Sequence, residues 1–123
     1  MSGYSYLINF LQSEGYRHEE HETNVSFKFE GVSYFGMRNS DNDYLQIVLI
    51  CNTKDVDRFK LLEACNAINS QKFAAKLTVT DDSESVWANY EFKPNASTTA
   101  DDFDSILRLL DHATDEFFKL LRD

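Results

Sequence analysis

The sequence predicts an α+β fold with a mainly antiparallel sheet, in the order α-β-β-β(-β)-α-β-β-α. In several short segments apolar residues alternate with polar ones, which is the pattern of strands with one buried face. In three longer segments apolar residues recur at spacings of three and four, as on one face of a helix. Short polar turns separate most of the strands, which favours antiparallel neighbours. We expect residues 1–123 to form a single domain.

The first half of the chain supplies the first helix and most of the strands. The first helix is expected over Tyr4–Glu14, with Gly15 as a left-handed cap at its C-terminus. The charged stretch Tyr16–His21 is the least regular strand and fits a sheet edge exposed on both faces. The remaining strands of this half are Val25–Phe29, Val32–Gly36 after a turn at Gly31, and, after the polar loop 39–43, the apolar run Tyr44–Cys51, which we expect at the centre of the sheet.

The stretch Leu61–Thr80 contains both patterns and joins the two halves of the chain. Leu61, Ala64, Cys65 and Ile68 share one helical face, and residues from Phe73 to Thr80 then alternate as a strand. This indicates a helix packed on a sheet.

The same central helix is apolar on more than one side. Thr53 or Asp55 can cap it, and it extends to about Ser70. Val56 and Phe59 lie off its main apolar stripe. Two apolar sides on one helix of a small domain favour self-association.

A hairpin and a long helix complete the chain. The strand Val86–Phe92 follows a turn at Asp81–Ser83 and pairs with the strand before it. Ser97–Thr99 followed by two aspartates is typical of a helix start, and an apolar stripe then extends from Phe103 to Leu121.

The charge balance limits the partners of the chain. Lys and Arg number 12 and Asp and Glu number 21, which gives a net charge of −9. This charge disfavours nucleic acids and anionic membrane surfaces, and it attracts proteins or peptides with basic stretches. No apolar run is long enough to span a membrane, and no secretory signal is recognisable, so a cytoplasmic protein with reduced thiols at Cys51 and Cys65 is expected.

No catalytic constellation is recognisable, and we expect neither an enzyme nor a cofactor. Cys65 has no histidine near it in sequence, and the chain has no glycine-rich phosphate loop. The cluster His18–Glu22 is a candidate metal site. His18 and His21 are spaced i and i+3 in an expected strand, which directs them to opposite faces, so a solvated polar edge is the better interpretation.

The remaining candidates are apolar residues on expected surfaces. Trp87 points away from the core if Val86 and Ala88 point inward. It either packs beneath a neighbouring side chain or forms a contact patch with the second face of the central helix or with residues of the last helix. The candidate partner or dimer surface comprises Val56, Phe59, Leu62, Trp87, Leu109 and Phe118.

Several segments resemble the YbjN-like bacterial sensory transduction regulators. They are Gly15-Tyr16, VSFKFEG at 25–31, YLQI at 44–47, LLEACNAIN at 61–69 and AKLTV at 75–79, and the terminal helix matches in position. The resemblance implies a fold similar to type III secretion chaperones, which are small acidic proteins that are commonly homodimers. Chaperones of that fold hold an extended client segment in apolar grooves, without nucleotide, and the family provides no catalytic residues to transfer.

Three functional hypotheses follow, in order of preference. The first is a non-enzymatic protein-binding module, chaperone-like or regulatory, that holds a partner segment on an apolar surface of a homodimer. The second is a small-ligand or metal-binding regulator that uses the polar cluster around His18 and His21. The third is a hydrolase with a pocket that the sequence does not reveal.

Overall fold

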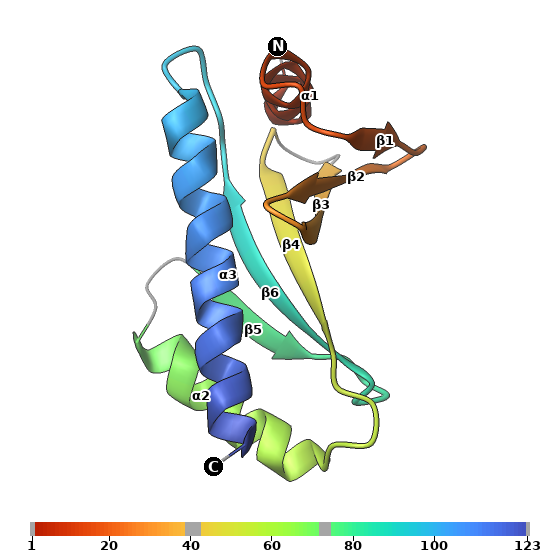
Figure 1. Cartoon of the computed structure of the whole chain (residues 1–123), viewed down its shortest axis with the longest axis vertical. Coiled ribbons are helices and arrows are strands. Elements are labelled where there is room, and N and C mark those ends of the chain that lie inside the picture. Colours follow the sequence, from red (N-terminus) through yellow and green to blue (C-terminus); the bar gives the residue numbers. More distant parts are fainter. Residues whose placement is uncertain (1, 39–42, 72–74, 123) are drawn as a thin grey trace.

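The computed structural model describes residues 2–38, 43–71 and 75–122. Its six strands form one antiparallel sheet in the order β1-β2-β3-β4-β6-β5, with the helices gathered on one side (Figure 1). The elements are α1 (Gly3–Ser13), β1 (His18–Glu20), β2 (Asn24–Phe29), β3 (Val32–Arg38), β4 (Leu45–Asn52), α2 (Arg58–Gln71), β5 (Lys76–Val79), β6 (Ser85–Phe92) and α3 (Ala100–Arg122). The α+β prediction, its element order and the central place of β4 are therefore confirmed. Most of the expected loop at 39–43, and the start of a strand at Phe73, lie outside the described residues.

The C-terminus of α1 and the N-terminus of α3 are formed by the capping residues that the sequence predicts. After α1, Gly15 adopts the left-handed conformation with φ of 70°, and the backbone N–H of Tyr16 donates to the carbonyl of Leu11 at 3.0 Å. Before α3, the Thr99 hydroxyl accepts from the N–H of Asp102 at 3.2 Å, and the Asp102 carboxylate accepts from the N–H of Thr99 at 2.8 Å. This reciprocal capping box fixes where α3 begins.

The start of α2 differs from the sequence prediction. Neither Thr53 nor Asp55 caps it; the Asp57 carboxylate accepts from the N–H of Lys60 at 3.3 Å, and the helix begins at Arg58. Thr53 is buried and donates to the Ser83 carbonyl at 3.1 Å, while Asp55 occupies a turn with φ of 72°. Val56 therefore lies in the connection before the helix.

One hydrophobic core lies between the helices and the facing side of the sheet, which we call the covered face. It includes Leu7 and Leu11 from α1, Ile47 from β4, and Leu107 and Phe117 from α3. Helix α1 lies very close to β3, because a Cβ atom on Gly36 would overlap the side chain of Leu7. None of the helices among the described residues is both long and apolar enough to cross a bilayer.

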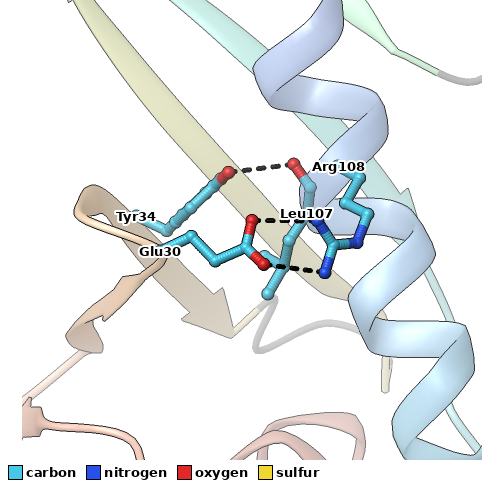
Figure 2. Close-up of polar contacts among 4 residues, drawn as sticks. All are labelled: Glu30, Tyr34, Leu107 and Arg108. Atoms are coloured by element: carbon cyan, nitrogen blue, oxygen red, sulfur yellow. Dashed lines mark hydrogen bonds and ion pairs between the residues drawn. The ribbon is translucent and has the colours of Figure 1, made fainter.

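The β2–β3 hairpin is fastened to α3 by two polar contacts (Figure 2). The buried Tyr34 hydroxyl donates to the Leu107 carbonyl at 2.9 Å. The Arg108 guanidinium donates to both carboxylate oxygens of Glu30, at 2.8 and 2.9 Å. Glu30 and Gly31 form the two-residue turn with φ of 51° and 80°, a conformation that glycine adopts readily and glutamate rarely. The turn therefore presents the Glu30 carboxylate to α3.

The β5 edge of the sheet is occupied by α2. The Asn69 side-chain amide accepts from the N–H of Leu77 at 2.7 Å and donates to the Leu77 carbonyl at 3.0 Å. Arg58, the first residue of α2, donates to the carbonyl of Thr80, which directly follows β5, at 2.8 Å. The two bonds to Leu77 use backbone groups that an added strand would need.

Candidate interaction surface

The side of the sheet opposite the core carries no helix of the described chain, and we call it the open face (Figure 1). Strand residues alternate between the two faces, so the neighbours of the core residues point outward here. Several of these outward residues are apolar: Phe35 and Met37 of β3, Val48 and Ile50 of β4, and Trp87 of β6. An apolar stripe therefore crosses the three central strands.

The register brings these side chains together. Phe35 lies opposite Val48, and Ile50 lies opposite Trp87, which also lies opposite Thr78 of β5. Opposed residues on one face have Cβ atoms about 5 Å apart, so their side chains are in contact range. Val48 is fully buried by its neighbours, whereas Ile50 is 37% exposed. The stripe thus has a packed centre and an exposed end.

A shallow groove of about 500 Å³ lies beside Trp87. Its lining includes outward residues of β4, β5 and β6: Gln46, Thr78, Trp87 and Asn89, with Asp81 at the adjoining turn. The Gln46 amide donates to the side-chain carbonyl of Asn89, which holds the polar part of the floor in place. The groove offers an aromatic wall and amide groups, a combination suited to polypeptide contacts.

The exposed side of α2 continues this surface around the β5 edge. Leu62 lies one turn after Arg58 and seven residues before Asn69, so all three share one side of the helix. Because Arg58 and Asn69 bond to the backbone at the β5 end of the sheet, Leu62 lies along that edge. Leu62 is 41% exposed and Phe59, three residues earlier, is 68% exposed.

The six residues proposed from the sequence fall into two groups. Phe59, Leu62 and Trp87 lie at the β5 end of the molecule, on α2 and the open face. Leu109 and Phe118 are half-buried on α3 and pack against the covered core, as does Val56 before α2. The structure therefore does not bring Trp87 to Leu109 or Phe118.

Sequence reasoning missed Phe35, Val48 and Ile50 as residues of the open face. The signal was present in the run Leu45–Cys51, which is apolar at almost every position instead of at alternate ones. Such a run places apolar side chains on both faces of a strand. The same run is also typical of a central strand, which is the interpretation given to it above.

The two histidines do not converge. His18 lies opposite Phe27 and therefore faces the core side, where its Nδ1 is 2.9 Å from the Tyr16 carbonyl. His21 lies beyond β1, and its Nε2 is 3.2 Å from the Ser26 hydroxyl. Within the described ranges, no three His, Cys, Asp or Glu side chains are arranged to hold a metal ion.

The thiols of Cys51 and Cys65 are buried, and their environment makes them poor nucleophiles. Burial raises the pKa of Cys51 to about 12 and that of Cys65 to about 11. Both side chains are thus protonated at neutral pH, and a thiol is a far weaker nucleophile than a thiolate. They serve as small core residues between β4 and α2.

Comparisons with known proteins agree with this architecture. Among solved structures, the chain is similar to YbjN, "a putative transcription regulator from E. coli", with 15% identity, a TM-score of 0.66, and coverage of 96% of this chain and 88% of that one. It is also similar to an uncharacterized protein from Methanothermobacter thermautotrophicus, with 10% identity, a TM-score of 0.68, and coverage of 98% and 96%. No curated protein matches the chain. Residues 6–123 match the YbjN family, described as "putative bacterial sensory transduction regulator", and the chain therefore belongs to the YbjN family.

Proposed function

We propose that this protein is a non-enzymatic regulator that acts by binding a polypeptide on its open face. The observation that carries the proposal is the apolar stripe of Phe35, Ile50 and Trp87, packed around the buried Val48, on a sheet face that no helix of the described residues covers. Apolar patches that reach the surface mark sites of association when they are large enough. The family description, which names a sensory transduction regulator, supports the same class of function.

We place this regulator in the cytoplasm and assign it no cofactor. It can bind an extended segment of its partner in the way that a chaperone does. Trp87 is the natural anchor, because tryptophan is enriched among the residues that dominate binding energy. The amide groups of Gln46 and Asn89 beside it can satisfy polar groups of a bound chain.

Site-specific photocrosslinking tests the proposal. A benzophenone amino acid replaces Trp87 in the full chain, and a second variant carries it at His112, whose side chain is 60% exposed on α3. In irradiated cells we expect polypeptide adducts from position 87 and few from position 112. The same adducts from both positions, or none from position 87, would contradict a binding role for the open face.

A further inference from the structure

A second groove, of about 470 Å³, lies at the β1 end of the open face, on other strands than the groove beside Trp87. Its lining includes Arg17, which precedes β1, and the outward residues Glu19, Ser26, Lys28 and Ser33 of β1, β2 and β3. Where the first groove offers an aromatic wall, this one offers cations and hydroxyl groups. We call it the cationic groove.

The strand register places the polar groups of the cationic groove next to one another. Lys28 lies opposite Ser33 in the β2–β3 ladder. The backbone N–H of Lys28 donates to the carbonyl of Arg17 at 3.2 Å, which continues the β1–β2 ladder one residue beyond His18. Opposed residues on one face of a sheet have Cβ atoms about 5 Å apart. A guanidinium, an ammonium and a hydroxyl group are therefore neighbours on this face.

The two cations of the groove are not neutralised by the protein itself. Arg17 and Lys28 are exposed, and no residue of the described ranges forms an ion pair or a side-chain hydrogen bond with either of them. Glu19 lines the same groove without pairing with them, whereas Arg108 on α3 is bound by both carboxylate oxygens of Glu30.

This arrangement is unusual for a chain with 21 acidic and 12 basic side chains. Like charges at opposed positions destabilise a sheet, and a groove that holds charges of one sign attracts a ligand of the other sign. An anion bound between Arg17 and Lys28 would remove the repulsion between them. The cationic groove therefore favours an anionic ligand, although the protein as a whole is acidic.

We infer that the cationic groove binds a phosphate monoester. Such a group carries a charge of about −1.5 to −2 at neutral pH and three acceptor oxygens. The Arg17 guanidinium can donate to two oxygens in parallel, the Lys28 ammonium to the third, and the Ser33 hydroxyl to any of them. A carboxylate has two oxygens and one charge, so it matches this donor set less well. The inference goes beyond the proposed function, because it assigns a ligand to a part of the open face that lies away from Trp87.

An NMR titration of the isotope-labelled full chain with N-acetyl-phosphoserine amide tests this inference. At constant ionic strength, we expect saturable shifts of the backbone amides of Lys28 and Ser33. Lys28→Gln should raise the Kd about tenfold, because it removes a charge-assisted hydrogen bond to the phosphate. Lys76→Gln is the matched control, since Lys76 is an exposed cation of the same face on β5, and it should leave the Kd nearly unchanged. Ser33→Ala changes no charge and should raise the Kd about threefold.

Three outcomes overturn the inference. The first is a titration whose shifts do not saturate or lie outside the cationic groove. The second is an equal loss of affinity in Lys28→Gln and Lys76→Gln, which would show a response to net charge and not to a site. The third is equal binding of N-acetyl-aspartate amide, which would remove the preference for phosphate. The substituted side chains are exposed, so none of these variants removes a core residue.

A second probe identifies the source of the phosphate. Tighter binding of N-acetyl-phosphoserine amide than of glycerol 2-phosphate would support a phosphorylated polypeptide as the ligand, and the reverse order would support a small phosphorylated molecule. Both orders keep the monoester site, and binding of neither probe refutes it. Crosslinking at position 87 reports on the other groove, so the proposed function and this inference can fail separately.

Discussion

The two faces of the sheet use the same strands, yet they can bury the same type of side chain very differently. On β4, Ile47 points to the covered face and is fully buried, while Ile50 points to the open face and is 37% exposed. Both are isoleucines on one strand, three residues apart. The exposure of these two isoleucines therefore depends on the face on which each lies and not on side-chain chemistry. The helices α1, α2 and α3 all pack on the side to which Ile47 points.

The largest expected effect comes from truncating these two isoleucines. Ile47→Ala should lower the free energy of unfolding by about 2–5 kcal/mol, because it leaves a cavity in the core. Ile50→Ala should lower it by about 1 kcal/mol or less, because solvent already reaches this side chain. Urea unfolding, at protein concentrations low enough to exclude association, measures both. Equal losses would mean that the open face is as tightly packed as the covered one.

A smaller effect is expected where α1 meets the covered face. Gly36→Ala places a methyl group against Leu7 and 3.1 Å from Val25, and should cost about 1–3 kcal/mol of stability through overpacking. In a Leu7→Ala background the same substitution should cost less, because its main steric neighbour is gone. A double-mutant cycle by urea unfolding gives this coupling. An unchanged cost in that background would show that α1 does not set the space available at Gly36.

The smallest effect concerns charge on the helical side of the molecule. Burial raises the pKa of Asp111 on α3, and the nearby carboxylates of Asp115 and Glu30 raise it further. A carboxyl whose pKa is higher in the folded state than in the unfolded state destabilises the fold when it is ionised. The penalty is full above the folded pKa and vanishes below the unfolded value of about 3.9.

Asp111→Asn should therefore raise the thermal midpoint slightly at neutral pH, and the gain should disappear as the pH falls below about 4. Asp101→Asn, at an exposed position in the first turn of α3, is the control and should lower the midpoint slightly, because it removes a favourable charge from the helix N-terminus. A gain for Asp111→Asn that persisted in acid would rule out an electrostatic origin.

Much of the fold could be predicted because its signals are local. The alternation in β2 and β6, the left-handed Gly15 and the cap at Thr99 each act within a few residues. The cap of α2 was mispredicted because three polar residues, Thr53, Asp55 and Asp57, compete within one short connection. The choice among them depends on a distant contact, the bond from Thr53 to Ser83.

The candidate surface was harder to predict, since it depends on which face the helices cover. Alternation identified Trp87 as outward, and helical spacing identified Phe59 and Leu62. No local pattern tells that β3 lies beside β4 with Phe35 opposite Val48, because sheet order is a long-range property. Leu109 and Phe118 lie beside the apolar stripe of α3, and only the packed structure shows how much of each is covered.

The amide of Asn69 on the β5 edge has a consequence for how large an assembly can become. A strand edge with free backbone groups can accept another strand, which then offers an edge of its own, and such growth has no natural end. At Leu77 both backbone groups are already bonded to Asn69, and at the other edge β1 is short and charged. A sheet face, in contrast, is used up by one partner. Association through the face adds no strand to either edge, so the chain can carry apolar surface there without growing into a fibre by strand addition.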